Sequence, residues 1–137
     1  MGLPVKIKNL LAIAIAIAIV GTVSTQIQAQ QPGFTRVPLQ TQDLSTPGKV
    51  AVQARAEFDP GVAAGKHTHP GEELGYVLEG QLELRIDGQP PKIIKAGETF
   101  FVPEGLAHDG INTGTVKTKV LATYVVEKGK PVATPAK

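Results

Sequence analysis

The chain has 137 residues, with 14 Lys and Arg against 12 Asp and Glu, and it contains no Cys. This length accommodates one compact domain, and a net charge of +2 provides no strong field for attracting nucleic acid. The absence of Cys excludes a disulfide scaffold, a CxxC site and a thiol nucleophile. The three histidines therefore hold most of the chemistry that the composition leaves open.

Residues 1–29 are predicted to be a secretory signal peptide. Lys6 and Lys8 precede an apolar run of eleven residues from Leu10 to Val20, and Ala29 is the small residue that a signal peptidase accepts. As a helix this run rises about 17 Å, against a hydrocarbon core of roughly 30 Å, so it is short for a membrane span. An uncleaved N-terminal anchor is the alternative. Cleavage would give a periplasmic or secreted protein. The apolar run is not preceded by the twin-arginine pair that marks export of a folded chain, so export in the unfolded state is expected.

Residues 30–49 follow as an extended lead-in that can add an edge strand. Residues 50–126 then show the period-two alternation of apolar and polar side chains that is typical of strands. Strands are predicted over 50–58, 73–79, 82–86, 93–94, 99–102 and 116–126, separated by Gly and Pro turns. Asp87-Gly88 is a strong hairpin signal. Because no helical periodicity follows the signal, the prediction is an antiparallel all-β sandwich or barrel, ending in a flexible tail over 127–137.

The histidines are spaced as a metal-binding cluster. His67 and His69 are two residues apart in an extended stretch, so both imidazoles project from the same face. A bend at Pro70-Gly71 would return Glu73 to that side, and His108 could approach from a neighbouring strand. Three imidazoles and one carboxylate form a donor set that borderline divalent metals prefer. The alternative is that the His-x-His pair lies on the surface without a function.

The residues around these histidines resemble the two motifs of the cupin family. Gly61-(5)-His67-Thr68-His69-(3)-Glu73-(6)-Gly80 is similar to the first motif, and Gly97-(5)-Pro103-Glu104-Gly105-(2)-His108-(3)-Asn112 is similar to the second. All motif positions are filled. The resemblance implies a double-stranded β-helix, or jelly roll, over residues 50–126, with one metal held by His67, His69, Glu73 and His108. Asn112 is expected to be structural rather than a ligand.

The resemblance leaves the reaction open, because cupins include dioxygenases, decarboxylases, isomerases and lyases as well as binding and sensing proteins. The leading hypothesis is an exported metal-dependent enzyme that acts on a small oxygenated compound. The alternatives are a non-catalytic cupin that binds a metal or small ligand, and a barrel with a vestigial site. No catalytic base is evident. Glu72 and Asp109, beside ligands, are expected to face solvent, and Lys66 to be exposed. Of Tyr76, Phe100 and Phe101, at least two are expected to pack in the core.

The sequence restricts the identity of the metal and of the partners less than it restricts the ligands. One divalent transition metal is expected, from among Zn, Cu, Fe, Mn and Ni. Acquisition outside the cytosol favours zinc or copper. The expected partner is a small-molecule ligand or substrate, with no nucleic acid and no stable membrane span after signal removal. The resemblance also implies a homodimer, to which residues 30–48 could contribute through edge-strand pairing.

Overall fold

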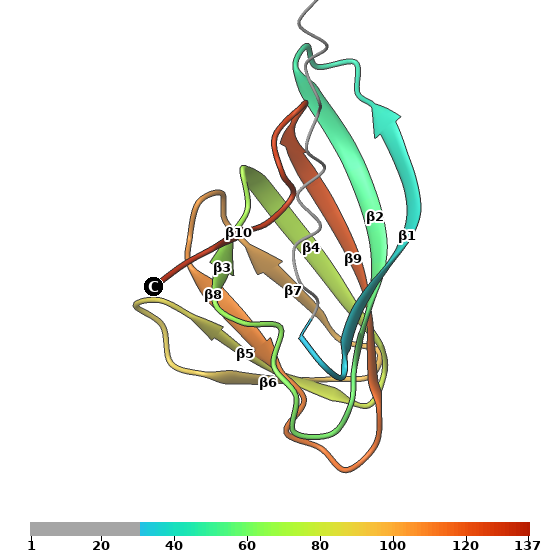
Figure 1. Cartoon of the computed structure of the whole chain (residues 1–137), viewed down its shortest axis with the longest axis vertical. Helices are drawn as coiled ribbons and strands as arrows, with labels where there is room; N and C mark the ends of the chain where they lie inside the picture. The colour runs from blue at the N-terminus through green and yellow to red at the C-terminus, as the bar shows by residue number, and fades with distance from the viewer. Residues whose placement is uncertain (1–30) are drawn as a thin grey trace, which may run out of the picture.

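The computed structural model describes residues 31–137, which form ten strands arranged as two sheets (Figure 1). The predicted signal peptide lies outside the described residues. The strands, in chain order, are β1 Phe34–Asp43, β2 Lys49–Phe58, β3 His67–Thr68, β4 Gly71–Glu79, β5 Gln81–Ile86, β6 Lys92–Lys95, β7 Thr99–Val102, β8 His108–Ile111, β9 Thr118–Glu127 and β10 Thr134–Pro135. No helix in this part of the chain is long and apolar enough to cross a membrane.

The two sheets each contain five antiparallel strands. One has the order β1-β2-β9-β4-β7 and the other the order β10-β3-β8-β5-β6. Strands that are distant in sequence are therefore neighbours, as β2 and β9 are over their whole length. This arrangement confirms the predicted all-β jelly roll. The predicted strands are present with ends that differ by a few residues, and Asp87-Gly88 begins the turn between β5 and β6.

The core lies between the sheets because alternate residues of each strand face inward. In β9 the pattern is strict, with Val120, Ala122, Tyr124 and Val126 buried and the residues between them partly exposed. The lead-in contributes to the same interior. It forms β1 at the edge of the first sheet, and Phe34 packs against Phe58 with ring centroids 4.8 Å apart.

The C-terminal residues differ from the flexible tail expected over 127–137. Residues 134–135 form β10, which pairs with β3, and the Ala136 N–H donates to the carbonyl of Lys66 at 2.9 Å. Ala133 is buried. Pro135 is compatible with this place because β10 is at the edge of its sheet, where a strand tolerates a missing donor. The tail is therefore folded back against β3, which carries His67 and Thr68 of the first motif (Figure 1).

The motif glycines occupy the predicted bends. Lack of space for a Cβ atom is not the general reason that these positions require glycine. Gly61, Gly80, Gly97 and Gly105 all have positive φ, between 73° and 87°. No atom lies within 4 Å of a Cβ added at Gly61, Gly97 or Gly105, whereas Gly80 would meet Thr118 Oγ1 at 2.7 Å. The left-handed backbone conformation is the requirement that these positions share.

Candidate metal centre

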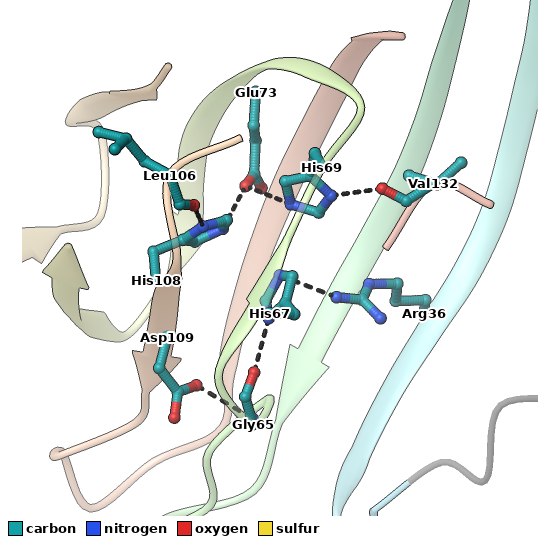
Figure 2. A network of polar contacts seen from close by, with 9 residues as sticks. All are labelled: Arg36, Gly65, His67, His69, Glu73, Leu106, His108, Asp109 and Val132. Atoms are coloured by element: carbon teal, nitrogen blue, oxygen red, sulfur yellow. Dashed lines mark hydrogen bonds and ion pairs between the residues drawn. The ribbon is translucent and has the colours of Figure 1, made fainter. Parts of the chain in front are cut away.

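The structure brings His67, His69, Glu73 and His108 together between the two sheets, and all four are buried. His67 lies on β3 and is paired in register with His108 on β8. His69 follows β3, and the chain then turns into β4, which presents Glu73 inward. The three histidine rings have centroids 4.4 to 4.9 Å apart. The spatial cluster expected from the spacing is therefore present in the fold (Figure 2).

Backbone carbonyls fix the orientation of each imidazole. The Nδ1 atoms of His67, His69 and His108 lie 2.6, 2.6 and 2.9 Å from the carbonyl oxygens of Gly65, Val132 and Leu106. A carbonyl only accepts hydrogen bonds, so each Nδ1 carries the hydrogen and donates it. In the neutral imidazole, each Nε2 therefore bears a lone pair. A ring held by its other nitrogen in this way is the usual arrangement of a metal-ligating histidine.

The Glu73 carboxylate completes a set of donors that suits a cation. Its Oε2 atom lies 3.1 Å from His69 Nε2 and 3.2 Å from His108 Nε2. Two lone pairs at such a distance repel unless a proton or a cation lies between them. Two ligand atoms that are each about 2.2 Å from one ion, at right angles, are about 3.1 Å apart. The spacing of these donors therefore fits a divalent metal.

The charge states of the buried groups agree with this arrangement. Burial lowers the pKa of His67 to about 4, although its hydrogen bond to Gly65 works in the opposite direction, so the imidazole is neutral at pH 7. Burial alone would raise the pKa of Glu73, but the polar contacts with the His108 and His69 imidazoles outweigh it and lower the pKa to about 2; in the metal-free chain a proton on Nε2 takes the place of the cation. The site therefore combines an ionised carboxylate with a neutral imidazole at His67.

Three of the donors, His67, Glu73 and His108, line a small cavity of about 30 Å³ whose remaining walls are mainly apolar. Phe58, Leu82, Leu84 and Phe100 form much of this surface. Phe34, Arg36, Ala64 and His67 also line a larger hollow outside it, of about 640 Å³, together with Lys66 and residues near the C-terminus. A small ligand could therefore reach the donors from the outer hollow past Arg36 and His67.

Several contributors to the site were not anticipated from the sequence. The Val132 carbonyl belongs to the segment expected to be flexible. Asp109, expected to face solvent, accepts a hydrogen bond from the Gly65 N–H at 3.0 Å, and Gly65 in turn binds His67 (Figure 2). Arg36, two residues after the buried Phe34, places a guanidinium nitrogen 3.3 Å from His67 Nε2. The position of Arg36 on the same strand face as Phe34 was a signal that could have indicated this placement.

Tyr124 also borders the donors, with its ring centroid 4.7 Å from that of His69. Burial and the nearby Glu73 carboxylate raise the pKa of the Tyr124 phenol far above its ordinary value, so the hydroxyl stays protonated.

Asn112 is structural, as expected. Its amide donates to the carbonyls of Phe58 and Val116 at 3.1 and 2.7 Å, and its side-chain oxygen accepts from the Gly114 N–H.

Of the three aromatic residues Tyr76, Phe100 and Phe101, only Phe100 packs against the core. Phe100 also lines the cavity. Tyr76 and Phe101 are 43% and 52% exposed, because they lie on the outward faces of β4 and β7. The expectation that at least two of the three pack inside was therefore wrong. Lys66 is partly exposed and pairs with Asp87 at 2.9 Å.

The cupin domain family matches residues 54–132, and the chain belongs to this family. The chain is similar to germin-like protein 3-5 of Oryza sativa subsp. japonica, with 35% identity in an alignment 78 residues long that covers 51% of this chain and 34% of that relative. It is also similar to oxalate oxidase 2 of Hordeum vulgare, with 32% identity over 51% of this chain and 35% of the relative. The chain thus spans about a third of the length of these curated relatives.

Solved structures agree with the family assignment. An oxalate oxidase in complex with the substrate analogue glycolate matches 77% of this chain and 56% of its own, with 26% identity and a TM-score of 0.62. A protein of Thermus thermophilus matches 69% of this chain and 86% of its own, with 21% identity and a TM-score of 0.57. The second likeness concerns the fold alone.

Proposed function

We propose that this chain is a metal-dependent cupin enzyme that binds one divalent transition metal through His67, His69, Glu73 and His108 and acts on a small oxygenated compound. The observation that supports this proposal most directly is the orientation of the three imidazoles. Each Nδ1 donates to a backbone carbonyl, which leaves each Nε2 with a lone pair, and those of His69 and His108 lie beside the Glu73 carboxylate. The similarity to oxalate oxidases supports a small-molecule ligand.

The residues of this chain would each contribute to such chemistry. Four protein ligands around an octahedral ion leave two positions open, and a metal held in this way supplies Lewis acidity to a bound ligand. The carbonyls of Gly65, Leu106 and Val132 hold the imidazoles in the tautomer that can donate a lone pair. The apolar walls around Phe100 limit the access of water, and the protonated Tyr124 hydroxyl provides a hydrogen-bond donor.

A non-catalytic cupin that binds a metal or a small ligand is the second candidate. The observation that favours it is the size of the inner cavity. About 30 Å³ offers room for little more than one or two water-sized groups. A ligand larger than this would have to extend into the outer hollow.

The test begins with the metal. The protein is purified from its own compartment, its metal is measured by mass spectrometry, and oxygen uptake and product formation are followed with catechols, flavonols and small dicarboxylates. We expect one divalent transition metal per chain and turnover that His108→Ala abolishes. Glu72→Gln is the matched control, because Glu72 adjoins Glu73 but lies on the opposite face of β4. Activity that survives complete loss of the metal would contradict the enzymatic proposal, and stoichiometric metal without turnover would favour the second candidate.

Export and dimerisation complete the proposal. Export rests on the predicted signal at residues 1–29. A homodimer is supported by exposed apolar side chains on the outward faces of β4 and the edge strand β7, namely Leu74, Tyr76, Leu78 and Phe101. The exposed edge strand β1, which contains much of the predicted lead-in, offers a second surface for pairing. Sedimentation of the wild type and of Leu74→Glu with Phe101→Glu tests the first surface, and a dimer that persists in this variant would exclude it.

A further inference from the structure

Arg36 lies where the inner cavity meets the outer hollow, since it lines both. Its side chain extends from β1 toward His67 (Figure 2). The guanidinium carbon lies 4.9 Å from the centroid of the Phe34 ring, which supports the group from one side. The guanidinium is therefore held next to the proposed metal ligands rather than extended into solvent.

The hydrogen-bonding capacity of Arg36 is incompletely used. One terminal nitrogen donates to His67 Nε2 at 3.3 Å, a long bond. The Nε atom is buried and has no hydrogen-bond partner within residues 31–137. Across the same part of the chain no carboxylate forms a salt bridge with Arg36. A buried donor on a permanently charged group requires an acceptor, and an anion would satisfy it best.

The contact with His67 also conflicts with metal binding. His67 Nδ1 is committed to the Gly65 carbonyl, so Nε2 is the nitrogen available to a metal. Arg36 donates to the same lone pair. Because one lone pair cannot serve both partners, a metal that binds His67 must release the guanidinium. The released terminal nitrogen would then be available to another acceptor at the boundary of the cavity, as the buried Nε is.

We propose that Arg36 is an anion-binding residue that couples the metal to its ligand: it leaves His67 when the metal binds and then pairs with the carboxylate of a small organic acid. This inference rests on the proposed metal centre. A carboxylate matches the planar donors of a guanidinium, which can bind it through two parallel hydrogen bonds. The limited space of the inner cavity restricts the part of the acid that reaches the metal to a few atoms. Metal and acid therefore strengthen each other's binding.

The experiment measures the affinity of the metal-free full chain for Co²⁺ by calorimetry, with and without excess formate as the probe anion. For the wild type we expect formate to raise the Co²⁺ affinity by at least about fivefold. In Arg36→Gln we expect tighter Co²⁺ binding without formate, because the competitor for His67 is removed, and no further increase with formate. Arg36→Lys keeps the charge but lacks the planar fork, so it should retain only part of the formate effect.

Lys66→Gln is the matched control for charge alone, because Lys66 lines the outer hollow but has no hydrogen bond to a histidine. It should keep the full formate effect. A formate effect of equal size in the wild type and Arg36→Gln would overturn the inference, since the anion would then bind the metal without Arg36. A chain that binds no Co²⁺ would overturn the metal centre itself, and with it this inference, so the two failures are distinguishable.

Discussion

The Nδ1 atom of His69 lies 2.6 Å from the carbonyl oxygen of Val132, which is 63 residues further along the chain. This hydrogen bond joins the first motif to the C-terminal segment that folds back beside β3. It fixes the tautomer and the orientation of a proposed ligand from a part of the chain that contains no ligand. The C-terminal residues are therefore part of the support of the site.

Removal of residues 131–137 should weaken metal binding while leaving the two main sheets folded. Loss of an outer partner of a ligating histidine typically costs about 10- to 100-fold in metal affinity. Calorimetry with Co²⁺ would measure the effect, and circular dichroism would confirm the fold. A shorter truncation that removes Ala136 and Lys137 retains Val132 and should bind nearly as well as the full chain. Equal affinities of all three proteins would show that the contact does not support the site.

Asp109→Ala should reduce both stability and metal affinity. The carboxylate accepts a hydrogen bond from Gly65, whose carbonyl holds His67. The lost bond should cost about 1 kcal/mol in the free energy of unfolding, and a less constrained His67 should bind the metal several-fold more weakly. Asp109→Asn keeps an acceptor oxygen and should recover most of the affinity. If Asp109→Asn is as impaired as Asp109→Ala, the charge and not the hydrogen bond is responsible.

Metal removal should lower the stability of the wild type in a manner that depends on Glu73. A ligand present at 100 times its dissociation constant stabilises the folded state by about 2.7 kcal/mol. Denaturant unfolding with metal and with a chelator should therefore differ by about this amount. Glu73→Gln should show little difference between the two conditions, whereas Glu72→Gln should behave as the wild type does. A chelator effect that persists in Glu73→Gln would place the metal elsewhere.

The metal-free protein should become less stable as the pH falls from about 6.5 to about 4. Burial, opposed in part by the bond to Gly65, lowers the folded-state pKa of His67 from 6.5 to about 4. Over this interval the unfolded chain binds a proton at His67 that the folded chain does not, so the free energy of unfolding falls by up to about 3 kcal/mol. Glu73, whose pKa is lowered from 4.5 to about 2, stabilises the fold above pH 4.5, and this contribution is lost below that pH.

The variant His67→Gln separates the contribution of the His67 imidazole to the pH dependence from that of the other titrating groups. Urea unfolding of both metal-free proteins between about pH 7 and pH 4 should give a smaller pH dependence for the variant. Identical slopes would mean that His67 takes up its proton equally in the folded and unfolded chains.

Gly75→Ala should destabilise the fold. A Cβ at this position of β4 would lie 2.1 Å from ring carbons of Phe100, which packs over the glycine on the neighbouring strand β7. Insertion of a methyl group into such a contact typically costs about 1 to 3 kcal/mol. In the background Phe100→Leu, with a smaller side chain, the cost of Gly75→Ala should be reduced. Equal costs in both backgrounds would exclude the contact with Phe100 as the cause.

The strand pattern and the histidine spacing predicted the sheets and the grouping of the four proposed ligands, because alternation specifies which residues share a face. The same reasoning did not predict the supports. Gly65 and Val132 act through backbone carbonyls, which every residue has, so no residue type indicates them. Asp109 neighbours His108 on a strand and is therefore predicted to face solvent, yet it accepts a hydrogen bond from the Gly65 N–H. Arg36 belongs to the predicted lead-in, outside the range predicted for the barrel, so the strand pattern does not place it at the site.

The contact between Val132 and His69 also bears on the order of events during synthesis. The segment that contains Val132 is synthesised after the proposed ligands, because it follows them in the chain. The ligands at residues 67–108 are all available before that segment, but the carbonyl that orients His69 is not. The centre can therefore reach its final geometry only after Val132 has been synthesised, and a shorter chain that meets a metal ion would hold it in an incompletely supported site.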